Sequence, residues 1–213
     1  MYNNILFDLD GTLTDPGIGI TNSVAYALEK FNIKVNDRQE LFKFIGPPLM
    51  ESFSRFCGFS ESDCEKAVVY YREYFADKGI FKNIVFEGVY ELLEKLKSQD
   101  KTLIIATSKP EIYALEILHH FDLYKYFSFV AGATLDYSRV KKADVIGYAL
   151  EQCGITDMSN CLMIGDREQD ILGAKSHNID SVGVLFGYGT LDELKNAGAN
   201  YIAESVGDIL RFV

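Results

Sequence analysis

The segment Asn4-Ile5-Leu6-Phe7-Asp8-Leu9-Asp10-Gly11-Thr12 places two aspartates directly after a short apolar run. A continuous apolar run of this length is typical of a strand that is buried on both faces of a sheet. We therefore expect one such strand at residues 4–9. Because side chains alternate along an extended chain, Asp8 and Asp10 project to the same side of it while Leu9 turns away.

The chain after Glu87 alternates amphipathic stretches with further short apolar runs. Val89, Leu92, Leu93 and Leu96 repeat at helical spacing, and the continuous apolar run 102–106 follows them. The same succession returns later, where a helical stripe from Val145 to Leu150 precedes the apolar run 160–164. This order of strands and helices predicts an α/β protein with a Rossmann-like open parallel sheet flanked by helices.

Residues 15–87 show a different pattern, without a convincing strand. One apolar stripe runs at helical spacing from Ile20 to Phe31 and another from Cys64 to Phe75, and Gly46-Pro47-Pro48 breaks the region between them. We expect an all-helical domain of residues 15–87, inserted into an α/β core formed by residues 1–14 and 88–213. Gly and Pro near residues 14–17 and 86–88 would permit the turns at its two borders.

Composition limits the kind of partner. The 213 residues are 48% hydrophobic and 24% charged, which is typical of a globular protein and excludes disorder. The formal net charge of −10 disfavours nucleic acid and anionic membranes, and favours a small molecule as the partner. No sequence feature indicates an oligomeric state.

Four cysteines, at positions 57, 64, 153 and 161, have spacings that suit neither a zinc site nor a disulfide-rich secreted scaffold, so we expect reduced thiols. The N-terminal strand carries aspartates where a signal peptide would need an unbroken apolar stretch, and no segment approaches the roughly 20 apolar residues of a membrane span. A cytoplasmic protein without membrane contact is the expectation.

Polar groups follow three of the predicted strands. Asp8 and Asp10 lie at the end of the first, Thr107-Ser108-Lys109 follows the second, and Gly165-Asp166 follows the third, with Asp170 four residues on. Ligands of open parallel sheets bind beyond the carboxyl ends of the strands, so these groups should converge on one crevice.

Four carboxylates in one crevice repel one another unless a cation neutralises them or a proton is shared. Because all the donors are oxygens, the cation should be hard, with Mg²⁺ first, Mn²⁺ as an alternative and Ca²⁺ less suited. Basic residues lie beside the same strand ends and would supply positive charge for a phosphate group. They are Lys109, Arg139, Lys141, Lys142 and Arg167.

These residues resemble, in order, the four motifs of the haloacid dehalogenase-like hydrolase superfamily, over essentially the whole chain. The insertion resembles the helical cap type of that superfamily. Gly46-Pro47-Pro48-Leu49 and Phe186-Gly187-Tyr188-Gly189 resemble its phosphoglycolate phosphatase-like branch. The resemblance implies a phosphatase that acts on a small phosphorylated metabolite.

By that resemblance, Asp8 is the nucleophile that forms an aspartyl-phosphate, and Asp10 is the general acid and base. Asp8, the backbone carbonyl of Asp10 and Asp166 would ligate Mg²⁺, and Asp170 would hold its waters or ligate it directly. Thr107 and the backbone at Ser108 would bind the phosphoryl oxygens.

The phosphate-binding lysine of the family matches either Lys141 or Lys142, because the Pro that often follows it is absent here. Lys142, followed by a small residue and then a helix, fits the pattern better.

Phosphoglycolate or a 5′-nucleotide is the expected substrate. The alternatives are a phosphomutase of the β-phosphoglucomutase type and a non-catalytic relative that senses phosphate or binds a partner. Structural explanations also stand for single motifs: Asp166 could cap the following helix, and Thr107 and Ser108 could cap the helix after Pro110.

Overall fold

A computed structural model describes residues 2–213, and the chain forms two compact units. One unit contains the chain up to Asp15 together with Val85–Val213, and the other contains Pro16–Ile84. The predicted domain borders, after residues 14 and 87, lie within three residues of this division.

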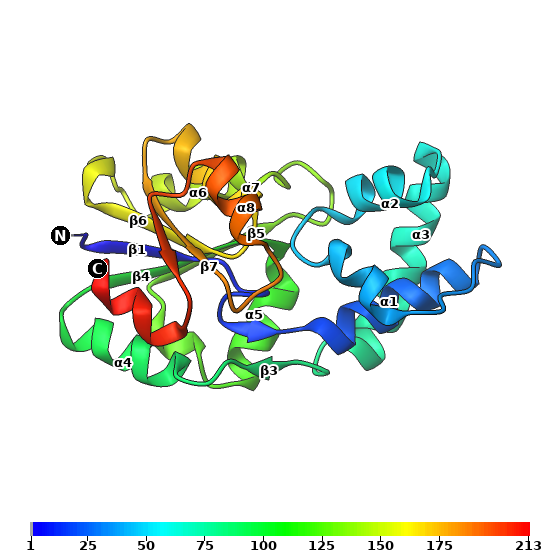
Figure 1. The fold of residues 1–213 in the computed structure, drawn as a ribbon, viewed down its shortest axis with the longest axis horizontal. Coiled ribbons are helices and arrows are strands. Elements are labelled where there is room, and N and C mark those ends of the chain that lie inside the picture. Colours follow the sequence, from blue (N-terminus) through cyan, green and yellow to red (C-terminus); the bar gives the residue numbers. More distant parts are fainter. Residues whose placement is uncertain (1) are drawn as a thin grey trace. The chain divides into compact units, whose positions relative to one another are not determined.

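The larger unit is built on a six-stranded parallel sheet with the order β5-β4-β1-β6-β7-β8 among the described residues (Figure 1). The strands are β1 (Asn4–Phe7), β4 (Thr102–Pro110), β5 (Phe129–Ala133), β6 (Cys161–Gly165), β7 (Asp180–Val184) and β8 (Tyr201–Ala203). Ile5 of β1 pairs with Leu103 on one side and Leu162 on the other, and all three side chains are fully buried. Burial on both faces explains the continuous apolar runs of the sequence.

Helices cover both faces of this sheet (Figure 1). One face carries α4 (Val89–Ser98), α5 (Glu111–His120) and the 3₁₀ helix η5 (Val206–Arg211); the other carries α6 (Lys142–Gln152), α7 (Glu168–Ser176) and α8 (Leu191–Ala197). Two short 3₁₀ helices, η3 (Tyr124–Tyr126) and η4 (Met158–Asn160), lie in connections. The apolar stripes predicted for α4 and α6 are buried. The parallel strand pairing and the helices on both faces confirm the predicted parallel sheet flanked by helices.

The strand order reverses direction between β1 and β6. From β1 the chain continues through β4 to β5 on one side, whereas from β6 it continues through β7 to β8 on the other. Such a point leaves a crevice beyond the carboxyl ends of the two strands, because their connections leave in opposite directions. Asp8 follows β1 and Asp166 follows β6, so both stand at this crevice.

The smaller unit is helical, with its apolar stripes turned inward. It contains α1 (Gly17–Glu29), the 3₁₀ helix η1 (Arg38–Phe44), α2 (Leu49–Cys57), α3 (Glu61–Tyr74) and the π-helix η2 (Phe75–Gly79). Pro48 directly precedes α2, as the sequence predicts, and the Ser60 side chain caps α3 by accepting the Asp63 N–H. The stripe from Cys64 to Phe75 is buried.

Three features of the backbone depart from the sequence-based expectation. The two-residue strands β2 (Thr14–Asp15) and β3 (Ile84–Val85) pair where the chain passes between the units, and they are too short to show periodicity. β1 ends at Phe7, not at Leu9. β4 continues past Ala106 to Pro110, with a shift of its register against β5 between those two residues.

All four cysteines are free, and Cys64 and Cys161 are buried. No helix within residues 2–213 has the length and apolar character that a membrane crossing requires.

The buried face of α4 gives a first testable prediction. Leu93→Ala should lower the free energy of unfolding by about 2–5 kcal/mol, because Leu93 is fully buried and its removal leaves a cavity. Leu172→Ala in α7 is the matched control, since Leu172 is 49% exposed; it should change stability by less than about 0.5 kcal/mol. Urea denaturation followed by circular dichroism measures both, and equal losses would contradict the burial of Leu93 in the core.

Candidate active site

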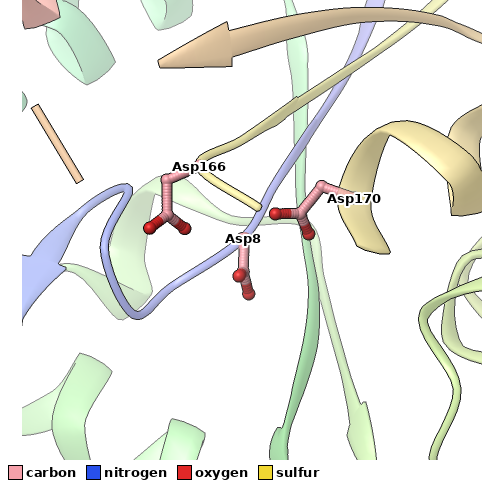
Figure 2. Close-up of side chains that lie close together, drawn as sticks. All are labelled: Asp8, Asp166 and Asp170. Carbon is pink, nitrogen blue, oxygen red and sulfur yellow. The ribbon is translucent and has the colours of Figure 1, made fainter. Parts of the chain in front are cut away.

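Three buried carboxylates meet at the carboxyl end of the sheet. Asp8 directly follows β1, Asp166 directly follows β6, and Asp170 lies in the first turn of α7. Figure 2 shows the three side chains close together, reaching from these separate elements, and each offers an oxygen within 4.8 Å of the others. The convergence expected from the strand ends is thus present for these three residues.

Lys142, the first residue of α6, joins two of these carboxylates. Its Nζ lies 2.9 Å from Asp8 Oδ1 and 2.7 Å from Asp170 Oδ1, and it donates a hydrogen bond to the Ala106 carbonyl at 3.0 Å. Burial lowers the pKa of Lys142, but Asp170 and Asp8 more than offset this, and the net shift is upward. Lys141 is exposed. Of the two lysines that the sequence left open, the structure brings Lys142 into the cluster.

Backbone N–H groups orient each carboxylate. Leu9 N–H donates to Asp8 Oδ1 at 2.8 Å, Arg167 N–H to Asp170 Oδ2 at 3.0 Å, and Tyr188 N–H to Asp166 Oδ2 at 2.7 Å. The residue at the N-cap of α7 is Arg167, so the interpretation of Asp166 as a helix cap is wrong.

The segment Phe186–Gly189 packs directly against Asp166. A side chain at Gly187 or Gly189 would overlap Asp166, so the close approach of this backbone requires glycine at both positions. Within residues 2–213, the second carboxylate oxygen of Asp166, Oδ1, is buried and accepts no hydrogen bond. Burial raises the pKa of Asp166 well above its usual range, and the neighbouring Asp170 and Asp8 raise it further.

Asp10 has a separate cationic partner, Lys109. The Lys109 Nζ lies 2.6 Å from Asp10 Oδ2, and both side chains are buried. Burial raises the pKa of Asp10, and Lys109 opposes that rise. The sequence placed Lys109 among the basic residues near the strand ends but assigned it no partner. The sequence feature that could have indicated a place for Lys109 in the site is its position two residues after Thr107.

The predicted phosphate-binding residues Thr107 and Ser108 lie on the irregular end of β4. Thr107 is buried, Ser108 is half-buried, and Thr107 Oγ1 accepts the Lys109 N–H at 3.2 Å. Because α5 begins at Glu111 with Pro110 at its N-cap, the interpretation of Thr107 and Ser108 as helix caps is wrong.

Two of the remaining basic residues bind carboxylates outside the cluster. Arg139 pairs with Glu111 at 3.0 Å, and Arg167 pairs with Glu193 at 2.8 Å. Lys109 and Lys142 are therefore the cations paired with Asp8, Asp10 and Asp170 in the part of the chain that the structure describes.

The charges and donor atoms of this site fit a divalent cation. Four buried carboxylates, including Asp10, stand against two buried ammonium groups, which leaves two formal negative charges. Buried charges require compensation, and the donors at Asp8, Asp166 and Asp170 are all carboxylate oxygens. Asp166 Oδ1, buried without a hydrogen-bond donor from residues 2–213, is a suitable ligand atom.

The ion pairs of Lys142 give the second prediction. In the absence of divalent cations, Lys142→Met should lower the free energy of unfolding by about 3 kcal/mol, because Asp8 and Asp170 are then left buried without their cation. Lys141→Met, which removes an exposed lysine, should change it by less than about 0.5 kcal/mol. Chemical denaturation at neutral pH with EDTA measures the difference. Similar stabilities for the two variants would show that the buried ion pairs are not formed in solution.

Comparison with known proteins agrees with this geometry. Residues 5–184 match the family model described as haloacid dehalogenase-like hydrolase. A 5′-nucleotidase of Pseudomonas aeruginosa is 46% identical over 194 residues, which are 91% of this chain and 87% of that protein. The tyrosine-protein kinase PtkA of Mycobacterium tuberculosis is 37% identical over 201 residues, which are 94% of this chain and 68% of that protein.

Among solved structures, a predicted phosphatase from Clostridium acetobutylicum superposes with a TM-score of 0.97 at 48% identity, covering 100% of this chain and 98% of that one. The family match spans most of the chain, and the family resemblance seen in the four sequence motifs is confirmed. The chain therefore belongs to the haloacid dehalogenase-like hydrolases and is an enzyme of the phosphatase kind.

Proposed function

We propose that the chain is a Mg²⁺-dependent phosphatase that hydrolyses a small phosphomonoester through an aspartyl-phosphate on Asp8. One observation carries the proposal: Asp8 is buried at the switch point of the sheet, with one carboxylate oxygen held by Lys142 and the Leu9 N–H, beside Asp166 and Asp170. Both contacts fall on Oδ1, so Oδ2 is the oxygen that we assign to attack phosphorus.

Lys142 supports Asp8 as a nucleophile in two ways. Its ammonium group forms an ion pair with the carboxylate, and its contact with Oδ1 fixes the direction in which the other oxygen points. The same ammonium group lies where it would attract the oxygens of a phosphoryl group on Asp8. Thr107 and the backbone at Ser108 would bind the remaining phosphoryl oxygens.

Asp8, the backbone carbonyl of Asp10 and Asp166 would hold Mg²⁺, with Asp170 as a direct or water-mediated ligand. When bound, the cation neutralises the excess carboxylate charge and the charge of the incoming phosphoryl group. Asp10 would protonate the leaving oxygen and later take a proton from the attacking water.

A 5′-nucleotide is the first substrate class to test, because the relative that is 46% identical bears the name 5′-nucleotidase. Phosphoglycolate is the second, on the resemblance of two short motifs. A small metabolite also suits the net charge of −10, which disfavours polyanions, and the free thiols suit a cytoplasmic location. The helical unit, residues 16–84, would act as the cap that selects the leaving group.

The nucleophile assignment gives the third prediction. The wild-type protein should release inorganic phosphate from 5′-nucleoside monophosphates, and Asp8→Asn should lower kcat by about 10⁴-fold or more, since the amide cannot attack phosphorus. A panel with phosphoglycolate, β-glucose 1-phosphate and a phosphotyrosine peptide ranks the substrates. Full activity of Asp8→Asn would refute the nucleophile. Conversion of β-glucose 1-phosphate without net phosphate release would favour the mutase alternative.

The metal assignment gives the fourth prediction. EDTA should abolish phosphate release and added Mg²⁺ should restore it, and Asp166→Asn should raise the Mg²⁺ concentration for half-maximal activity by about ten-fold or more. Isothermal titration of Mg²⁺ into wild type and Asp166→Asn measures the same change without catalysis. Unchanged Mg²⁺ affinity in the variant would remove Asp166 from the ligand set.

A further inference from the structure

The cluster contains two buried lysines with separate partners. Lys142 pairs with Asp8 and Asp170, whereas Lys109 pairs with Asp10. The side chain of Lys109 is 5% exposed and that of Asp10 is 10% exposed, so this ion pair is shielded from water. The proposed function gives Asp10 a proton-transfer role and leaves Lys109 without one.

The two oxygens of Asp10 differ sharply in their contacts. Oδ2 lies 2.6 Å from the Lys109 ammonium, whereas Oδ1 is buried and accepts no hydrogen bond from residues 2–213. One ion pair to a single oxygen fixes the rotation of the carboxyl group and leaves the other oxygen available.

The backbone holds Lys109 in place at the irregular end of β4. The register of β4 against β5 shifts between Ala106 and Pro110, and the Lys109 N–H donates to Thr107 Oγ1. Lys109 is thereby tied to Thr107, which the proposed function assigns to phosphoryl binding. A lysine fixed at both its backbone and its ammonium group can orient a partner with little loss of conformational entropy on binding substrate.

We propose that Lys109 is a positioning residue: by holding Oδ2 of Asp10, it aims Oδ1 at the leaving-group oxygen of the phosphomonoester. This inference rests on the proposed function. In the first step, Asp8 forms the new O–P bond as the ester O–P bond breaks. The proton on Asp10 Oδ1 passes to the ester oxygen, which leaves as a neutral alcohol, and Asp10 remains as a carboxylate paired with the Lys109 ammonium.

This role makes Lys109 important only where the leaving group needs a proton. An alkoxide leaves poorly without one, whereas p-nitrophenolate is a stable anion. A lysine that bound the substrate phosphate would instead affect both kinds of substrate and would act mainly on KM.

The test compares Lys109→Met and Lys109→Arg with wild type on p-nitrophenyl phosphate and on the best alkyl phosphate of the substrate panel. Lys109→Met should lower kcat about ten-fold or more for the alkyl phosphate and less than about three-fold for p-nitrophenyl phosphate, with KM nearly unchanged. Lys109→Arg, which keeps the charge, should recover most of the loss. Lys101→Met is the matched control, because Lys101 is a buried lysine directly before β4 whose Nζ donates to the Tyr2 carbonyl.

A double variant separates positioning from other roles. In an Asp10→Asn background, Lys109→Met should cause no further loss on the alkyl phosphate, since Lys109 acts through Asp10. Equal losses of kcat on both substrates, a rise in KM on both, or a further loss in the Asp10→Asn background would overturn the proposal. If Lys109→Met does not fold, Lys109→Gln takes its place under the same criteria. Absence of hydrolysis by the wild type would refute the proposed function itself, which is a separate result.

Discussion

The structure depends on the compensation of carboxylate charge at one buried edge of the sheet. Burial of an ionised aspartate costs more solvation free energy than packing provides, unless a cation lies beside the carboxylate. Lys142 meets this demand for Asp8 and Asp170 at once, and its ammonium group also binds the Ala106 carbonyl. Asp8 after β1, Ala106 within β4 and Asp170 in the first turn of α7 are therefore held against the start of α6 by one side chain.

Backbone N–H groups also bind the buried carboxylates, in addition to the two lysines. Asp8, Asp166 and Asp170 each accept one backbone N–H, from Leu9, Tyr188 and Arg167. A backbone donor is fixed by the fold and carries no formal charge, so it orients a carboxylate without neutralising it. The site thus separates two tasks, since backbone groups set the directions of the carboxylates and ammonium groups limit their total charge.

The sequence allowed the sheet and most of the site to be predicted because burial leaves a simple pattern. Strands buried on both faces appear as continuous apolar runs, and the polar residues that end them, such as Asp8 and Asp166, stand out. The position of Lys109 two residues after Thr107 indicated that it lies near the site, but its pairing with Asp10 was not predictable, because that depends on the continuation of β4 through an irregular segment to Pro110. The contact of Tyr188 with Asp166 joins residues 22 positions apart, with α7 and β7 between them. The Phe186–Gly189 motif singled out this segment, but no periodic pattern indicates which residue it contacts.

The backbone at Gly187 and Gly189 lies so close to Asp166 that neither position has room for a side chain. A methyl group at position 187 would overlap the side chain of Asp166, and one at position 189 would overlap its backbone carbonyl. Replacing either glycine by alanine adds only one methyl group, yet it would disturb the position of Asp166 itself.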